Sequence, residues 1–270
     1  METLIVVPAR FGSTRFPGKP LAEINGISMI RRTADVAARA CRDIRDSGYV
    51  IATDHEKIFN HCQAHNIPVL MTDPALPSGS DRAREAYRNF APEARFVVNL
   101  QGDAPFTDIS HITQCAKAML DGPDVATPYV QLSWDDLDIL RENKKTTPFS
   151  GTTLIHDENG RALWFSKNII PSIKHEAKLR AAQPLSPVRR HIGLYVYTVE
   201  ALERYITMPR SHYEAIEDLE QLRMVEANFV ITAVGVEPAK VSTSGIDSPE
   251  DLERATETVN LVGDPFEGVV

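Results

Sequence analysis

The chain has 270 residues, of which 43% are hydrophobic and 24% are charged, and its formal net charge is −8. This composition is typical of a globular protein with one large domain, or a domain with a lobe, and the net negative charge argues against general nucleic-acid binding. No apolar run is long enough to span a membrane, so we expect no membrane partner, and the negative charge leads us to expect no nucleic-acid partner. The three cysteines have neither zinc-site spacing nor an even number, which is typical of reduced thiols in a cytoplasmic protein.

The first 130 residues alternate short apolar runs with amphipathic stretches. The apolar runs predict strands at 4–7, 49–52, 69–71, 96–100 and 125–130, and the stretches between them predict helices at 28–41, 56–65, 81–90 and 109–120. This alternation predicts right-handed βαβ units in an α/β fold with a mostly parallel, doubly wound sheet. We expect residues 1–130 to form a nucleotide-binding α/β part.

The pattern changes near residue 131, and residues 131–260 predict a smaller α+β lobe interwoven with the same sheet. Its predicted elements are a helix at 134–141, a hairpin of 152–155 and 162–165 with an Asn-Gly turn, a strand at 191–197, a helix at 213–226, a strand at 229–236 and a last helix that begins at Ser248. Residues 171–190 contain three prolines and many charges, which predicts a long surface loop. Residues 261–270 predict a loose tail.

The loop after the first predicted strand combines cations with accessible backbone amides. Arg10, Arg15 and Lys19 lie within ten residues, which is either a solvated basic loop or an anion site. The amides and cations together suit a triphosphate, because they can neutralise several charges at once. The amides belong to Gly12, Ser13 and Thr14.

Two common phosphate-binding loops are excluded at this position. Five residues separate Gly12 from Gly18, where a P-loop has four, and Pro20 stands where a P-loop needs Ser or Thr. No G-x-G-x-x-G follows the strand either. A P-loop NTPase and a dinucleotide-dependent dehydrogenase therefore both lose support.

Two aspartates are candidate magnesium ligands. Asp103 follows the predicted strand at 96–100, and an Asp at the carboxyl end of a central strand points into the ligand crevice of an α/β sheet. Magnesium prefers one or two carboxylates together with phosphate oxygens. Asp247 is the second candidate, because Ser248 already fits the role of helix cap. A turn residue and a helix cap are the structural alternatives for the two positions.

Two further polar residues lie in apolar surroundings. Glu220 lies between Ile216 and Met224 at a spacing of four on one predicted helix, so its carboxylate needs a partner or a ligand. A partly exposed ion pair is the alternative. His191 precedes an apolar strand, where a structural histidine is the alternative to a ligand-binding one.

The ordered motifs resemble those of the 3-deoxy-manno-octulosonate (Kdo) cytidylyltransferases, also called CMP-Kdo synthetases. The matching segments cover nearly the whole chain in family order: PARFGSTRFPGKPL at 8–21, ATDH at 52–55, SGSDR at 78–82, NLQGD at 99–103, RALWFS at 161–166, RHIGLY at 190–195, LEQLR at 219–223 and GIDSPEDL at 245–252. The combination is specific for the family, whereas each piece alone is not.

The resemblance implies a Rossmann-like nucleotidyltransferase fold and a homodimer, with acceptor-binding and dimerisation residues in 131–260. It implies Mg²⁺-dependent transfer of CMP from CTP to an oxygen of a Kdo-like sugar acid, with release of pyrophosphate. The catalytic residues that it implies are Arg10, Lys19, Asp103 and Asp247, the two aspartates as metal ligands. The nucleotide-binding residues are Pro8, Ala9, Arg10, Gly12, Ser13, Thr14, Arg15, Lys19, Ser78, Gly79, Arg82 and Gln101. The acceptor-binding residues are Gln101, Lys167, His191, Tyr195, Glu220 and Gln221.

The chain departs from the family pattern mostly on the acceptor side. Ala104 stands where the family usually has Glu, residues 151–153 read Gly-Thr-Thr in place of Val-Lys-Val, and Lys167 stands in place of Arg. An Arg can clasp a carboxylate through two parallel bonds, which Lys cannot do. The acceptor could therefore be a modified octulosonate or a small phosphonate.

Three other readings remain as alternatives. The order of the motifs disfavours a nucleotidyltransferase for sialic-acid-like acids or sugar phosphates. Retention of both Asp103 and Asp247 disfavours a catalytically inactive nucleotide-binding protein, because CTP binding alone needs the metal pair less. A purely structural interaction protein has no positive support in the sequence.

Overall fold

A computed structural model of the chain describes residues 1–12, 16–241 and 245–268. Within these residues ten strands form one central sheet, and two short strands, β2 (Glu23–Ile24) and β3 (Ile27–Ser28), form a separate hairpin. The strands of the central sheet are β1 (Thr3–Ala9), β4 (Ser47–Thr53), β5 (Val69–Met71), β6 (Phe96–Asn99), β7 (Val125–Ser133), β8 (Thr153–His156), β9 (Ala162–Ser166), β10 (Leu185–His191), β11 (Tyr195–Thr198) and β12 (Ile231–Gly235). Their order is β5-β4-β1-β6-β11-β7-β10-β8-β9, with β12 paired to β7.

The first half of the sheet is parallel, as the sequence predicts. β1 pairs in parallel with β4 on one side and β6 on the other, and β4 pairs in parallel with β5. The four residues 4–7 of β1 are completely buried, which explains their continuous apolar character. The chain moves from β1 to β4 and β5 on one side and then returns to β6 on the other side of β1. The order of the strands therefore reverses between β1 and β6.

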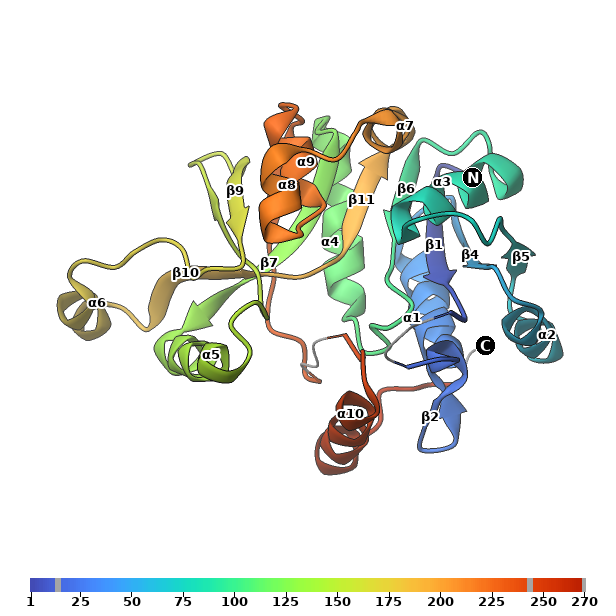
Figure 1. Cartoon of the computed structure of the whole chain (residues 1–270), viewed down its shortest axis with the longest axis horizontal. Helices are drawn as coiled ribbons and strands as arrows, with labels where there is room; N and C mark the ends of the chain where they lie inside the picture. The colour runs from blue at the N-terminus through green and yellow to red at the C-terminus, as the bar shows by residue number, and fades with distance from the viewer. Residues whose placement is uncertain (13–15, 242–244, 269–270) are drawn as a thin grey trace.

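Helices cover both faces of this sheet (Figure 1). The helices of the described residues are α1 (Met29–Asp43), α2 (Glu56–Ala64), α3 (Gly79–Phe90), α4 (Ile109–Ala118), α5 (Trp134–Thr146), α6 (Glu176–Ala182), α7 (Val199–Thr207), α8 (His212–Glu217), α9 (Gln221–Glu226) and α10 (Pro249–Val262), with the 3-10 turns η1 (Lys19–Leu21) and η2 (Met119–Asp121). α10 packs with β2 rather than with the central sheet. Alternate residues of β1 face different core clusters. Ile5 and Val7 pack with α1 and α4, whereas Leu4 and Val6 pack with α3 and α7. This three-layer arrangement confirms the predicted α/β fold.

The second half of the sheet is mostly antiparallel. β11 runs antiparallel between β6 and β7, and β10, β8 and β9 continue the sheet as antiparallel strands. The predicted hairpin is confirmed as β8 and β9, with Gly160 at a φ of 82° in the turn. α5 packs against β7 and β10 through a small apolar cluster of its own. The predicted parts 1–130 and 131–260 share one sheet, in which β11 is hydrogen-bonded to β6. The division of the chain near residue 130 stays a prediction.

Three of the predicted elements are wrong in this second half. Residues 171–190 are not a long loop, because they contain α6 and most of β10. The predicted helix at 213–226 is two helices, since Asp218 adopts the left-handed conformation (φ 52°) and ends α8. The predicted strand at 191–197 is the end of β10 and the start of β11, separated by residues 192–194.

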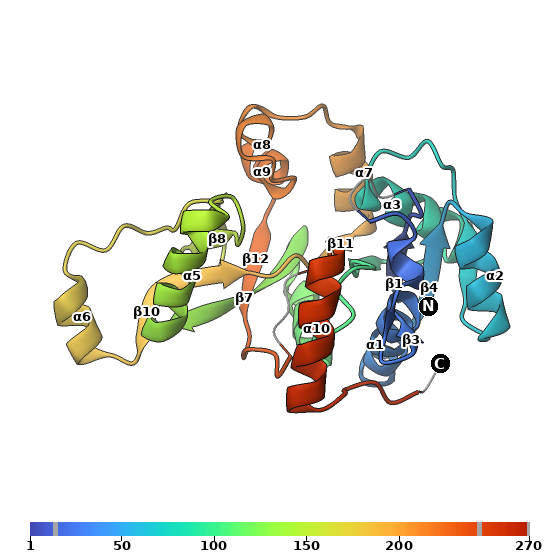
Figure 2. The ribbon, with the colours of Figure 1, turned by 60° about the horizontal axis from the view of Figure 1, so that its bottom comes forward.

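The C-terminal residues are bound to α1, so the prediction of a loose tail is wrong for residues 264–267. Arg32 Nη1 lies 2.6 Å from Asp264 Oδ1, and Arg39 Nη2 lies 3.1 Å from Glu267 Oε1. Figure 2 shows the segment after α10 running back toward α1. No helix among the described residues is long and apolar enough to cross a bilayer.

Candidate active site

A cavity of about 290 Å³ lies at the carboxyl ends of β1 and β6, and we call it the site cavity. Open α/β sheets bind ligands at this edge, where the order of the strands reverses. Its walls come from the loop after β1, from η1, from the start of α3, from the segment after β6, and from the residues before α9 and α10. The lining residues are Pro8, Arg10, Lys19, Pro20, Leu76, Pro77, Ser78, Gly79, Arg82, Gln101, Gly102, Asp103, Glu220 and Asp247.

Lys19 lies between the two candidate metal ligands. Its Nζ donates to Asp103 Oδ2 at 2.8 Å and to Asp247 Oδ1 at 3.1 Å. The Lys19 side chain is 13% exposed, whereas those of Asp103 and Asp247 are 31% and 42% exposed. Two carboxylates 144 residues apart in the sequence therefore converge on one point of the cavity, with a cation already beside them.

The backbone on the floor of the cavity is tightly packed. A Cβ atom on Gly102 would lie 2.5 Å from the carbonyl oxygen of Pro8, so only glycine fits between β1 and the segment after β6. Gly79 lies close to Pro8 and to the side-chain oxygen of Gln101, both of which a Cβ atom would contact. Ser78 begins α3 by accepting a hydrogen bond from the Asp81 amide at 3.1 Å. The N-terminus of α3 therefore lies at the cavity, where its backbone amides favour a negatively charged ligand.

Asp54 is a residue of this site that sequence reasoning missed. Its Oδ1 accepts from the Phe11 amide at 3.1 Å, and its Oδ2 lies 3.3 Å from Nη2 of the buried Arg82. Burial lowers the pKa of Arg82, and the Asp54 carboxylate opposes that shift. The loop after β1 and helix α3 are therefore joined through one carboxylate. The motif at 52–55 was the signal that could have found it.

Glu220 lines the site cavity. The apolar helix stripe that we expected around it, from Ile216 to Met224, does not exist. Ile216 is 64% exposed and belongs to α8, while Met224 is buried in α9, so the two residues do not share a face. Glu220 Oε2 accepts from Tyr205 Oη at 3.1 Å and from Ser80 Oγ at 3.3 Å. These two donors fix the carboxylate at the wall of the cavity.

A row of rings extends from Glu220 toward β9, and we call it the aromatic row. Its members, each 5.1–6.4 Å from the next between ring centroids, are Tyr205, Tyr197, Tyr195, His191 and Phe165. Burial is the main cause that raises the pKa of Tyr195, and Tyr197 and Glu220 raise it further. The predicted acceptor residues His191 and Tyr195 are thus joined to Glu220, although neither lines the site cavity.

His191 is held neutral in this row. Burial lowers its pKa to about 3. Its Nε2 lies 2.8 Å from Oγ1 of Thr127, whose hydroxyl donates to the carbonyl oxygen of Leu194 at 2.8 Å. Because the single hydroxyl proton is used there, Nε2 carries the proton of the imidazole and Nδ1 is an acceptor. At neutral pH this ring therefore carries no positive charge.

Two of the three places where we expect departures from the family pattern, residues 151–153 and 167, lie together. Lys144 Nζ donates to the carbonyl oxygens of Gly151 at 3.0 Å and Lys167 at 2.6 Å. Thr153 Oγ1 donates to the carbonyl oxygen of Asn168 at 2.7 Å. Burial lowers the pKa of Lys144, and the neighbouring cations Arg190 and Lys167 lower it further. Residues 151–153 and 167 are therefore one packed unit, which sequence spacing did not reveal.

The structure brings together most, but not all, of the predicted residues. Ala9 packs in the core and Gly12 is exposed, and neither lines the site cavity. Ser13, Thr14 and Arg15 lie outside the described residues. Lys167 and Gln221 also lie outside the cavity wall. Seven of the predicted nucleotide-binding residues line it, and they are Pro8, Arg10, Lys19, Ser78, Gly79, Arg82 and Gln101.

The donor set fits a magnesium ion held partly by substrate. Asp103 and Asp247 supply hard oxygen atoms that face one point, and magnesium is usually bound by one or two carboxylates plus phosphate oxygens. In the part of the chain that the structure describes, no group of three or more His, Cys, Asp and Glu side chains forms a complete metal cage. A metal at this position would therefore need further ligands from a bound substrate or from water.

Comparisons with known proteins agree on one family. A sequence model of the family described as Cytidylyltransferase matches residues 4–233. The chain is 35% identical over 266 residues to a 3-deoxy-manno-octulosonate cytidylyltransferase of Maricaulis maris, covering 98% of this chain and 99% of the relative. It is 37% identical to that of Porphyromonas gingivalis, covering 94% and 95%. A solved structure of CMP:2-keto-3-deoxy-manno-octonic acid synthetase complexed with CTP has a TM-score of 0.81 at 29% identity, covering 97% and 99%.

Proposed function

The chain belongs to the cytidylyltransferase family, and from this premise we propose that it transfers CMP from CTP to a Kdo-like sugar acid in a Mg²⁺-dependent reaction. The observation that carries the proposal is the convergence of Lys19, Asp103 and Asp247 in the site cavity. The acceptor oxygen attacks the α-phosphorus of CTP, the bond to the β-phosphate oxygen breaks, and pyrophosphate leaves.

Different residues of the site cavity would serve different parts of this reaction. Lys19 and Arg10 lie where they can neutralise the triphosphate and the departing pyrophosphate. Asp103 and Asp247 would hold Mg²⁺ together with phosphate oxygens. When bound, the ion stabilises negative charge on phosphate and lowers the pKa of a bound hydroxyl. Glu220, fixed by Tyr205 and Ser80, lies in the same cavity and is placed to accept a hydrogen bond from an acceptor hydroxyl.

A second candidate function keeps the CTP chemistry and changes the acid. It is favoured by the packed unit of residues 151–153 and 167, because two of the three expected departures from the family occur there and Lys144 binds the carbonyl oxygens of Gly151 and Lys167. A modified octulosonate or a small phosphonate would then replace Kdo as the acceptor.

A pyrophosphate-release assay with CTP and a panel of acids tests both proposals. The panel contains Kdo, modified octulosonates and small phosphonates, each measured with and without Mg²⁺. We expect CTP turnover with at least one acid and none without the metal. Fast turnover with Kdo alone would contradict a changed acceptor, and no turnover with any acid would contradict the enzymatic function.

A further inference from the structure

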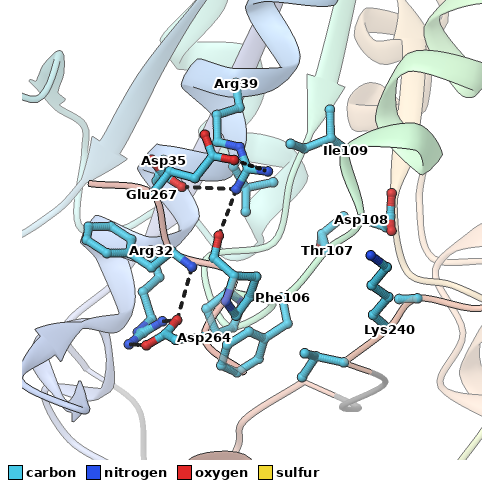
Figure 3. A pocket seen from close by; sticks show the side chains of 16 residues that line it. Arg32, Asp35, Arg39, Phe106, Thr107, Asp108, Ile109, Lys240, Asp264 and Glu267 are labelled. Atoms are coloured by element: carbon cyan, nitrogen blue, oxygen red, sulfur yellow. Dashed lines mark hydrogen bonds and ion pairs between the residues drawn. The ribbon is translucent and has the colours of Figure 1, made fainter. Parts of the chain in front are cut away.

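A second cavity of about 380 Å³ lies beside α1, between the segment after β6 and the C-terminal residues (Figure 3). It shares no lining residue with the site cavity. Its walls are one face of α1, residues 105–109, residues 239–241 and residues 264–267. The first of these loops begins two residues after Asp103, so the same chain segment contributes to both cavities.

Arg32 and Asp35 are two buried charged residues in the wall of this second cavity. Arg32 is the one that contacts the C-terminal segment most closely. Its side chain is 1% exposed, and its guanidinium forms two parallel bonds to Asp264, at 2.6 Å and 2.8 Å. Nη2 also donates to the carbonyl oxygen of Ile24 at 2.6 Å. The Arg32 hydrogen bonds lower the pKa of Asp264, which keeps this carboxylate charged at neutral pH.

The groups around Arg32 belong to the three segments that carry the charges of the site cavity. Ile24 lies in β2, which directly follows the turn η1 that begins at Lys19. Phe106, whose ring centroid lies 5.8 Å from Arg32 Cζ, is three residues beyond Asp103. Asp264 follows the end of α10, and α10 begins two residues beyond Asp247.

A small apolar cluster connects Arg32 to the aspartates. Its members come from the same segments and pack with one another, separately from the two large cores: Ile24, Met29, Phe106, Val241, Ile246, Ala255 and Val259. The Ile246 amide donates to the carbonyl oxygen of Asp103 at 3.0 Å, which joins the two aspartate segments directly. A shift of Phe106 or of α10 would therefore be transmitted to both carboxylates.

We propose that Arg32 and Asp264 are positioning residues, whose ion pair holds the segments of Lys19, Asp103 and Asp247 in the arrangement that the reaction needs. The role in the reaction rests on the proposed function. The pair is half-buried, because Asp264 is 33% exposed. The desolvation of Arg32 offsets much of the attraction, so the pair adds little net stability, but it can specify one arrangement of the chain. Residues beyond α10 thus support a site that they do not touch.

The decisive variant is Asp264→Asn, which keeps the shape of the side chain and removes its charge. We expect amide hydrogen exchange to become severalfold faster in residues 103–107 and 245–248, and to stay unchanged in β4 and β5. We also expect kcat for pyrophosphate release to fall about ten- to hundredfold, with KM for CTP nearly unchanged, because small displacements of reacting groups cost that much. Asp264→Glu restores the charge and should recover part of both losses.

Glu267→Gln is the matched control. Glu267 lies in the same C-terminal segment as Asp264 and also binds α1, at Arg39, which lies 3.1 Å away and contacts Asp35 and the carbonyl oxygen of Pro265 as well. This variant should keep wild-type exchange in residues 103–107 and wild-type kcat. If Asp264→Asn does not fold, Arg32→Lys, which keeps the charge and loses the two-pronged contact, gives the same comparison.

Three outcomes would overturn the proposal. The first is unchanged exchange in residues 103–107 and 245–248 of Asp264→Asn. The second is a loss in Glu267→Gln as large as that in Asp264→Asn, and the third is a rise in KM for CTP that accounts for the whole effect. If the wild-type protein releases no pyrophosphate with any acid, the proposed function fails. The exchange comparison still decides the positioning role in that case.

Discussion

The two sides of the candidate active site are built in different ways. In the site cavity, Lys19, Asp103 and Asp247 stand on short segments next to regular elements and meet at one point. In the aromatic row, His191 and Tyr195 lie within or beside antiparallel strands and are fixed by neighbouring rings. The first side depends on individual charges, and the second depends on a packed group. Single substitutions should therefore have abrupt effects on the first side and graded effects on the second.

The largest effect is expected from Asp103→Asn. The neutral amide cannot replace a carboxylate ligand or balance Lys19, so kcat for pyrophosphate release from CTP should fall about 10²–10³-fold, which corresponds to several kcal/mol. The control is Asp108→Asn, because Asp108 caps α4 through the Ser110 amide at 2.8 Å and lies outside the site cavity. Turnover that persists in Asp103→Asn would show that the metal assignment is wrong.

A smaller effect is expected from Lys167→Arg. If position 167 contacts the acceptor carboxylate, the two-pronged guanidinium should raise kcat/KM for Kdo about tenfold and leave KM for CTP unchanged. Lys145→Arg, on an exposed part of α5 paired with Glu142 at 2.6 Å, is the matched control. An unchanged kcat/KM for every acid in the panel would remove Lys167 from the acceptor side and weaken the contrast between the two sides.

The last effect concerns His191 and the stability of the fold rather than turnover. Because burial lowers its pKa to about 3, the ring stays neutral between pH 7 and pH 5, while the unfolded chain takes up a proton there. Its contribution to stability is complete above about pH 6.5 and is lost as the pH falls toward 3. His191→Gln should therefore reduce the loss of unfolding free energy between pH 7 and pH 5 by about 2 kcal/mol.

Urea unfolding at the two pH values measures this difference. His212→Gln, at an exposed position at the start of α8, should keep the wild-type pH dependence. If His191→Gln also kept it, the ring would not be held neutral by burial.

The sequence was informative where local rules determine structure. Residues 4–7 and 96–100 predict buried strands, and the position of Asp103 after the second of them predicts its place in the site cavity. Ser248 also caps α10 as predicted, and its partner in the capping box is Asp251. These features depend on neighbours within a few residues, so periodicity and spacing are sufficient to find them.

The sequence was less informative where contacts between residues far apart in the chain determine the structure. The sequence around Asp218 is compatible with a continuous helix, and no neighbouring residue predicts that α8 ends there. In the structure the left-handed conformation of Asp218 ends the helix. Glu220 reaches the cavity through Ser80 and Tyr205 rather than through a helix stripe. Residues 264–267 looked loose because their partners, Arg32 and Arg39, lie more than 220 positions earlier.

The continuity of the sheet limits how this protein can change shape. β11 is hydrogen-bonded to β6 on one side and to β7 on the other, so backbone bonds join the part that carries the site cavity to the part that carries β8–β10. A rigid-body hinge between the two parts would have to break those bonds. Any closing movement around two substrates must therefore occur in the connecting segments outside the strands, and separately produced halves would each expose an unpaired strand edge.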